Sequence, residues 1–147
     1  MLIHNNRNRN MKSVLMNLEI IAINIMLTMF VLSGIEKIVS FDKNVNQLKN
    51  ALMDWGAEYP TKILKFLLMA SLMIEIFAPI LVNYGITTKK YSYIIYSVYS
   101  LIALVMIYTI IFYIPPVGQN YYPFISNITT IGGLLLIIAE IKYSKYS

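Results

Sequence analysis

Four long apolar runs constrain the fold of this sequence more than any other feature. They cover residues 15–38, 63–82, 91–114 and 124–141. Each is close to the roughly 20 residues that an α-helix needs to cross a hydrocarbon core about 30 Å thick. Because 58% of the residues are hydrophobic and only 13% are charged, most of the surface must face lipid. The sequence therefore predicts an all-α membrane protein, a four-helix transmembrane bundle that forms one domain over residues 14–141.

The basic residues mark the ends of the spans and predict their orientation. The segments before the first span, between the second and third, and after the fourth contain Arg7, Arg9, Lys12, Lys89, Lys90, Lys142 and Lys145. The connection between the third and fourth spans, PPVGQNYYP, has no basic residue. By the positive-inside rule, both termini are cytoplasmic, although five lysines in the first connection oppose this orientation. Residues 1–13 are expected to form a disordered cytoplasmic tail and residues 142–147 a second tail.

The residue types exclude several classes of function. Cysteine is absent and His4 is the one histidine, so a metal centre built from thiolates or imidazoles within this chain is excluded. If redox chemistry takes place, the electrons travel on a partner protein or on a bound organic molecule such as a quinone. The basic residues are not clustered with aromatic platforms, which argues against nucleic-acid binding. The expected partners are the lipid bilayer and another membrane or peripheral protein.

The connection between the first two spans predicts a short amphipathic helix. Its apolar residues Val45, Leu48, Leu52 and Trp55 recur at helical spacing. We expect this helix to lie at the membrane interface, where tryptophan is favoured. Gly56 would end it and Pro60 would begin the next helix. The alternative is a polar loop with an accidental periodicity.

Glu75 is the strongest candidate for a functional residue. It lies inside the second span, where an unpaired charge costs at least about 2.5 kcal/mol. Pro79 follows four residues later and lacks an N–H group, so the Glu75 carbonyl loses its helical hydrogen bond. A carboxyl group and a free carbonyl at one depth form a candidate site for a proton, a cation or a polar ligand. The alternative is a structural glutamate beside a proline kink.

The depth of each residue in its span predicts the partners of Glu75. At 1.5 Å rise per residue, Asn24 in the first span and Ser100 in the third lie at nearly the same depth as Glu75. They are the expected partners in a polar ligand or proton site. Lys37 is expected about 16 Å from the midplane, which places it beyond the reach of Glu75.

An ordered set of residues resembles the DoxX family of membrane proteins over about residues 15–140. The set comprises Phe30, Gly34 and Lys37 in the first span, Gly56 and Pro60 before the second, Glu75 within it, Gly85 before the third, and Asn127, Gly132 and Gly133 in the fourth. Pro79 accompanies Glu75 as described above. Small residues such as Gly132 and Gly133 let another helix backbone approach closely.

The resemblance implies a compact four-helix membrane bundle and a place in a membrane oxidoreductase system. Under this hypothesis the chain is a quinone-linked or non-catalytic subunit, which is not catalytic alone and requires a catalytic partner. The alternative hypothesis is a non-enzymatic assembly protein or a protein similar to the cargo receptors of the secretory pathway, whose polar core only fixes helix packing.

Overall fold

A computed structural model describes the backbone of residues 2–146 and the side chains of residues 18–141. The elements are α1 (Leu2–Val39), α2 (Phe41–Asp54), α3 (Thr61–Thr88), α4 (Tyr91–Tyr113), η1 (Gly118–Asn120) and α5 (Tyr121–Tyr146). Four stretches are long and apolar enough to cross a membrane, namely Leu18–Val39, Thr61–Thr88, Tyr91–Tyr113 and Gly118–Ile141. No strand occurs within residues 2–146. The prediction of a four-helix membrane bundle is confirmed.

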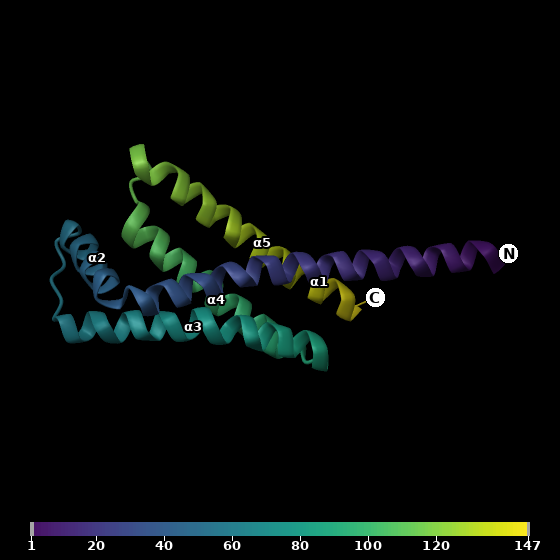
Figure 1. Cartoon of the computed structure of the whole chain (residues 1–147). Helices are drawn as coiled ribbons and strands as arrows, with labels where there is room; N and C mark the ends of the chain where they lie inside the picture. The colour runs from purple at the N-terminus through teal and green to yellow at the C-terminus, as the bar shows by residue number, and fades with distance from the viewer. Residues whose placement is uncertain (1, 147) are drawn as a thin grey trace.

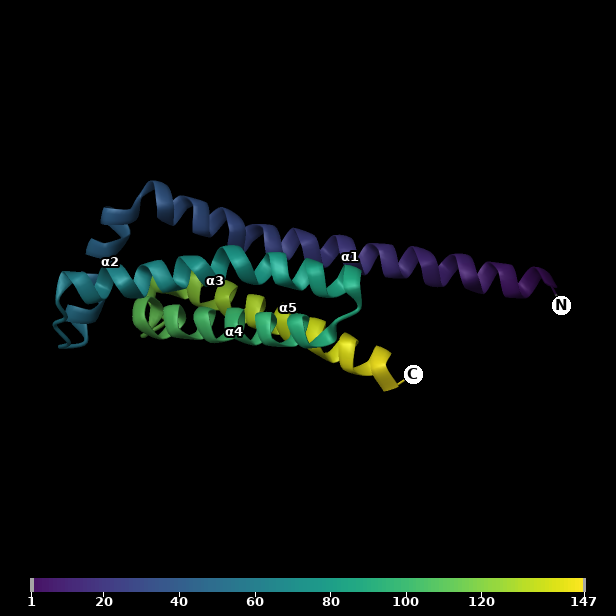
Figure 2. The ribbon, with the colours of Figure 1, turned by 90° about the horizontal axis from the view of Figure 1, so that it is seen from below.

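The long helices pack in the order α1, α3, α4, α5, each against the next (Figure 1 and Figure 2). The first part of α1, the last part of α5 and the turn between α3 and α4 lie at one end of the bundle, while α2 and η1 lie at the other (Figure 1). Toward the α2 end, α5 diverges from α1 (Figure 1). The divergence separates α1 from α5, which form the two walls of the space between them. Helices α3 and α4 form its floor.

A single apolar cluster holds the four long helices together. Leu27 of α1, Val82 of α3, Leu101 of α4 and Leu134 of α5 are all almost completely buried in it. Large apolar side chains also cover the outward faces of the helices, and Ile25, Phe66 and Tyr96 are among the most exposed. Inside a bilayer these outward faces contact lipid, which is as apolar as the side chains themselves.

The predicted amphipathic helix is confirmed as α2. Val45 and Leu48 are buried against Leu64 and Leu68 of α3. Beyond the helix end, Trp55 Nε1 donates a hydrogen bond to the carbonyl oxygen of Ile111 in α4 at 3.3 Å. The alternative of a polar loop is therefore wrong, and α2 is attached to the bundle by its apolar face.

The ends of α2 and α3 also follow the prediction. Gly56 has φ +74°, a conformation that glycine adopts without steric cost, directly after the C-cap Trp55. Pro60 is the N-cap of α3.

Three helices are longer than expected. Helix α5 runs from Tyr121 to Tyr146, whereas the expected span covered residues 124–141. The backbone of α1 begins at Leu2, so the first helix includes segment 2–13, which precedes the expected span. Extending a formed helix needs no new nucleation, which makes such an extension inexpensive. Helix α3 continues through Pro79 to Thr88, six residues beyond the expected end. It reaches α4 through a two-residue turn, in which Lys89 has φ 54°.

Gly85 lies inside the last turns of α3, not in a connection before the third span. A Cβ at Gly85 would lie 2.5 Å from Ile94 Cγ1 and 3.2 Å from the Ile94 backbone nitrogen. Glycine therefore permits the close approach of α3 and α4 at their tight turn.

Candidate functional site

Glu75 forms a buried ion pair with Lys37. Lys37 Nζ lies 2.6 Å from Glu75 Oε1 and 2.8 Å from Glu75 Oε2. It also donates a hydrogen bond to Ser33 Oγ at 2.7 Å, one turn back along α1. An ammonium group has three N–H donors, so these three contacts use all of them. The pair joins the end of α1 to the middle of α3, and both side chains are buried.

The predicted partners of Glu75 were wrong. Asn24 Nδ2 donates to the carbonyl oxygen of Ile20 at 2.9 Å, within its own helix. Ser100 Oγ donates to the Tyr96 and Ser97 carbonyl oxygens, also within its own helix. The residue that was placed beyond reach, Lys37, is the one that pairs with Glu75.

The error has a physical cause, because the spans do not share one midplane. A Cβ at Gly34 would lie 3.5 Å from Glu75 Cβ and 3.0 Å from Ile76 Cγ1, so Gly34 of α1 is level with Glu75 of α3. The N-terminal part of α3 extends past the end of α1, and α2 packs beside it there. This stagger places the last turn of α1 at the middle of α3.

Tyr108 of α4 lies next to the ion pair. Lys37 Nζ is 4.9 Å from the centroid of the Tyr108 ring, within the range of a cation–π contact. The Tyr108 hydroxyl lies 2.9 Å from Ser71 Oγ, and Ser71 itself donates to the Leu68 carbonyl oxygen at 2.8 Å. Because serine has one proton to donate, Tyr108 donates to Ser71 in this arrangement. Carboxylate, ammonium and aromatic ring thus form one connected group.

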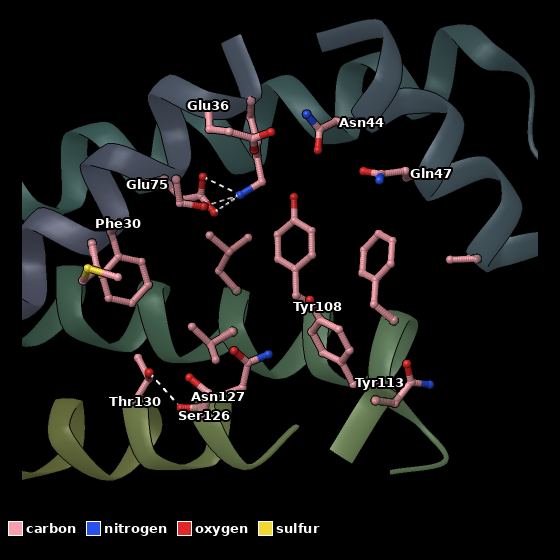
Figure 3. A pocket seen from close by; sticks show the side chains of 18 of the residues that line it. Phe30, Glu36, Asn44, Gln47, Glu75, Tyr108, Tyr113, Ser126, Asn127 and Thr130 are labelled. Carbon is pink, nitrogen blue, oxygen red and sulfur yellow. Dashed lines mark hydrogen bonds and ion pairs between the residues drawn. The ribbon is translucent and has the colours of Figure 1, made fainter. Parts of the chain in front are cut away.

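This group lies in a polar cleft of about 880 Å³ between the separated walls of the bundle. Figure 3 shows Glu36, Asn44 and Gln47 on one side, Ser126, Asn127 and Thr130 on the other, and Tyr108 between them. Apolar side chains line the deeper part, among them Met26, Phe30, Leu104 and Val105. The cleft is polar toward the α2 end and apolar toward the middle of the bundle.

The α5 wall is fixed by a hydrogen bond to α4. Asn127 Nδ2 donates to Thr109 Oγ1 at 3.0 Å, and Thr109 Oγ1 donates to the Val105 carbonyl oxygen at 2.6 Å. This arrangement leaves the Asn127 carboxamide oxygen free to accept a hydrogen bond. On the facing wall, Gln47 of α2 presents a second carboxamide to the cleft (Figure 3).

The residues of the set that resembles the DoxX family fall into two groups. Phe30, Lys37, Glu75 and Asn127 come from three helices and line the polar cleft. Gly34 and Gly85 mark close helix approaches, and Pro79 is buried in α3 outside the cleft.

The two glycines of α5 do not behave alike. Nothing lies within 4 Å of a Cβ at Gly132, whereas a Cβ at Gly133 would lie 2.9 Å from the Sδ atom of Met26. The expected backbone approach is therefore wrong for Gly132. At Gly133 the neighbour is a side chain of α1.

Sequence reasoning missed Ser33, Tyr108, Thr109 and Gln47. One signal was present, since Ser33 precedes Lys37 by four residues and so shares its helix face. Tyr108 was visible as one of several tyrosines in the third span, but nothing in the sequence separates it from those that face lipid. Gln47 enters the site only because α2 folds back over the cleft.

No protein-family model, curated protein or solved structure matches the chain. The fold alone defines the class, a multi-pass helical membrane protein with a polar cleft at one end of its bundle.

Proposed function

We propose that the chain is a DoxX-like, quinone-linked subunit of a membrane oxidoreductase system, and that it is not catalytic alone. The observation that supports this most is the meeting of Phe30, Lys37, Glu75 and Asn127 in one cleft. These four residues belong to the set that resembles the family, and they come from three helices that lie far apart in the sequence. A shared cleft gives the resemblance a physical meaning, because residues that serve one ligand must lie around it.

The cleft fits the head group of a quinone. Its volume of about 880 Å³ lies within the range typical of small-molecule sites. Tyr108 and Phe112 form a stacked aromatic pair with ring centroids 5.5 Å apart, and both line the cleft. Their rings offer a flat apolar surface, while the Gln47 carboxamide on the opposite wall offers donors to a carbonyl oxygen.

The Lys37–Glu75 pair would act on this ligand without a direct hydrogen bond from Lys37. All three donors of the ammonium group are used by Glu75 and Ser33. The pair therefore places an ammonium–carboxylate contact beside Tyr108, in which Lys37 Nζ lies 2.6 Å from a carboxylate oxygen that can accept a proton. A bound quinone would carry the electrons. These residues would position the quinone and hold the proton that accompanies each electron.

An assembly or cargo-receptor-like role is the alternative, and the rim of the cleft favours it. Asn44, Gln47 and Asn50 of α2 face Asn120 and Asn127 across the opening. Carboxamides both donate and accept hydrogen bonds, so two facing rows suit the backbone of an extended peptide.

Affinity purification of the full chain in a mild detergent tests the proposal. Solvent extraction of the purified protein should release a quinone, identified by its absorbance spectrum and mass, and an oxidoreductase should co-purify. Tyr108→Leu should lower the bound quinone at least fivefold. Tyr96→Leu makes the same change on the exposed face of the same helix and should leave it unchanged.

The purification can also give a result that contradicts the proposal. A folded parent protein that carries no quinone, and that captures a polypeptide through the α2 rim, would replace the proposal with the alternative.

A further inference from the structure

A second cavity lies between α1 and α5, on the side of Met26 away from the ion pair. It has a volume of about 680 Å³ and is lined by Ala22, Ile23, Met26, Gly133, Leu136 and Ile137, which we call the α1/α5 groove. Ala139, Glu19 and Glu140 complete its lining at the far end, and both carboxylate side chains are exposed. The groove is therefore apolar along its length and carries carboxylates only where it ends.

Met26 lines both the polar cleft and the α1/α5 groove. Its sulfur atom lies over Gly133, where a Cβ would come within 2.9 Å. A methionine side chain is unbranched and flexible, and it changes rotamer easily. Met26 is thus a flexible type of side chain that borders both cavities and rests on Gly133.

The polar cleft and the α1/α5 groove together form a path with the dimensions of a lipid-like molecule. From Lys37 to Glu19 the path follows 18 residues of α1, or about 27 Å at 1.5 Å rise per residue. The hydrocarbon core of a bilayer is about 30 Å thick. The path is polar at the ion pair and apolar from Phe30 to Ala22, which is the order of polarity in a molecule with a polar head and a long tail.

A single chain fits this path, whereas a helix does not. An α-helix with its side chains is about 10–12 Å wide. It cannot pass the point where Met26 of α1 rests on Gly133 of α5. A polyprenyl or acyl chain is far narrower than a helix, and a change of rotamer is the way in which Met26 would make room for it.

We propose that the polar cleft and the α1/α5 groove form one site, in which the head of a membrane quinone lies beside Tyr108 and its isoprenoid tail passes Met26 into the groove. This inference rests on the proposed function and specifies how the ligand enters. Because the groove opens between α1 and α5, the ligand reaches the cleft sideways from the bilayer. Met26 then acts as the side chain that the tail must displace.

A photoreactive quinone tests the position of the tail. The probe is a benzoquinone whose geranylgeranyl chain ends in a diazirine, added to the full chain in lipid nanodiscs and irradiated. Mass spectrometry should find the label on segments 19–26 and 133–140. An excess of unlabelled quinone should reduce this label at least fivefold, because the head competes for the cleft.

Ala22→Phe fills the groove from an exposed position and should lower the label in both segments at least fivefold. Ala103→Phe makes the same change at an exposed position of α4 outside both cavities and should leave the label unchanged.

Label that persists under competition would show that ordinary lipid fills the groove and would overturn the inference. So would label found mainly on α3 or α4. In either case the quinone content of the purified parent protein decides the proposed function separately. A parent that retains quinone after such a result keeps its proposed function and loses only the tail path.

Discussion

Lys37 and Glu75 are 38 positions apart in the sequence, yet the ammonium of one lies within 2.8 Å of both carboxylate oxygens of the other. The pair joins α1 to α3 in the part of the molecule where the other wall, α5, has moved away (Figure 1). It therefore fixes one wall of the cleft.

The first prediction concerns the stability that Lys37 and Glu75 contribute as a pair, as distinct from the contribution of each charge alone. Glu75→Leu should lower the free energy of unfolding by about 3–5 kcal/mol, because it leaves the Lys37 ammonium buried without its partner. The double variant Lys37→Met/Glu75→Leu should recover most of this loss, since replacing both charges with apolar side chains is often neutral. Thermal unfolding in detergent of the parent, both single variants and the double variant measures the coupling. Additive losses in the double variant would show that the two residues do not depend on each other.

The second prediction concerns the helix approach beneath the ion pair. Gly34→Leu should destabilise the bundle by about 1–3 kcal/mol, because the new side chain meets Ile76 and the base of Glu75 and pushes α1 from α3. Gly132→Leu is the matched control, since a Cβ there has nothing within 4 Å. The melting temperature in detergent should fall for Gly34→Leu alone. Equal effects would mean that loss of glycine, not the crowding of α1 and α3, causes the change.

The length of the apolar runs made the four spans predictable, and the spacing of Val45, Leu48, Leu52 and Trp55 made α2 predictable. Both properties depend on residues that are close in the sequence. The partner of Glu75 was not predictable in this way, because it depends on the stagger between α1 and α3. That stagger arises where Gly34 packs on Glu75 and Ile76, a contact that hydropathy does not record.

The candidate site was found only in part for the same reason. Glu75 was identified because a carboxylate inside an apolar run is costly wherever the helix lies. Lys37 belonged to the family-type set, but an assumed common midplane excluded it as a partner. Tyr108, Thr109 and Gln47 become site residues only through the divergence of α5 and the position of α2.

The third prediction concerns topology, and the absence of native cysteine makes the experiment clean. Single cysteines at Gln119 in η1 and at Thr88 beside the α3–α4 turn lie at opposite ends of the bundle (Figure 1). In intact cells an impermeant maleimide should label Gln119→Cys. Thr88→Cys should react only after the membrane is permeabilised, because seven of the 12 basic residues belong to segments at its end of the bundle. Labelling of both from the same side would contradict a bundle that spans the membrane.

The most direct test of the central claim is photolabelling with a quinone whose head group, not its tail, carries the reactive azide. We predict that the label falls on residues around the ion pair, in segments 30–37, 104–112 or 126–130, and that Tyr108→Leu reduces it at least fivefold while Tyr96→Leu does not. Label confined to outward-facing residues such as Phe66 or Ile25, with no change in Tyr108→Leu, would contradict the claim that this cleft binds a quinone.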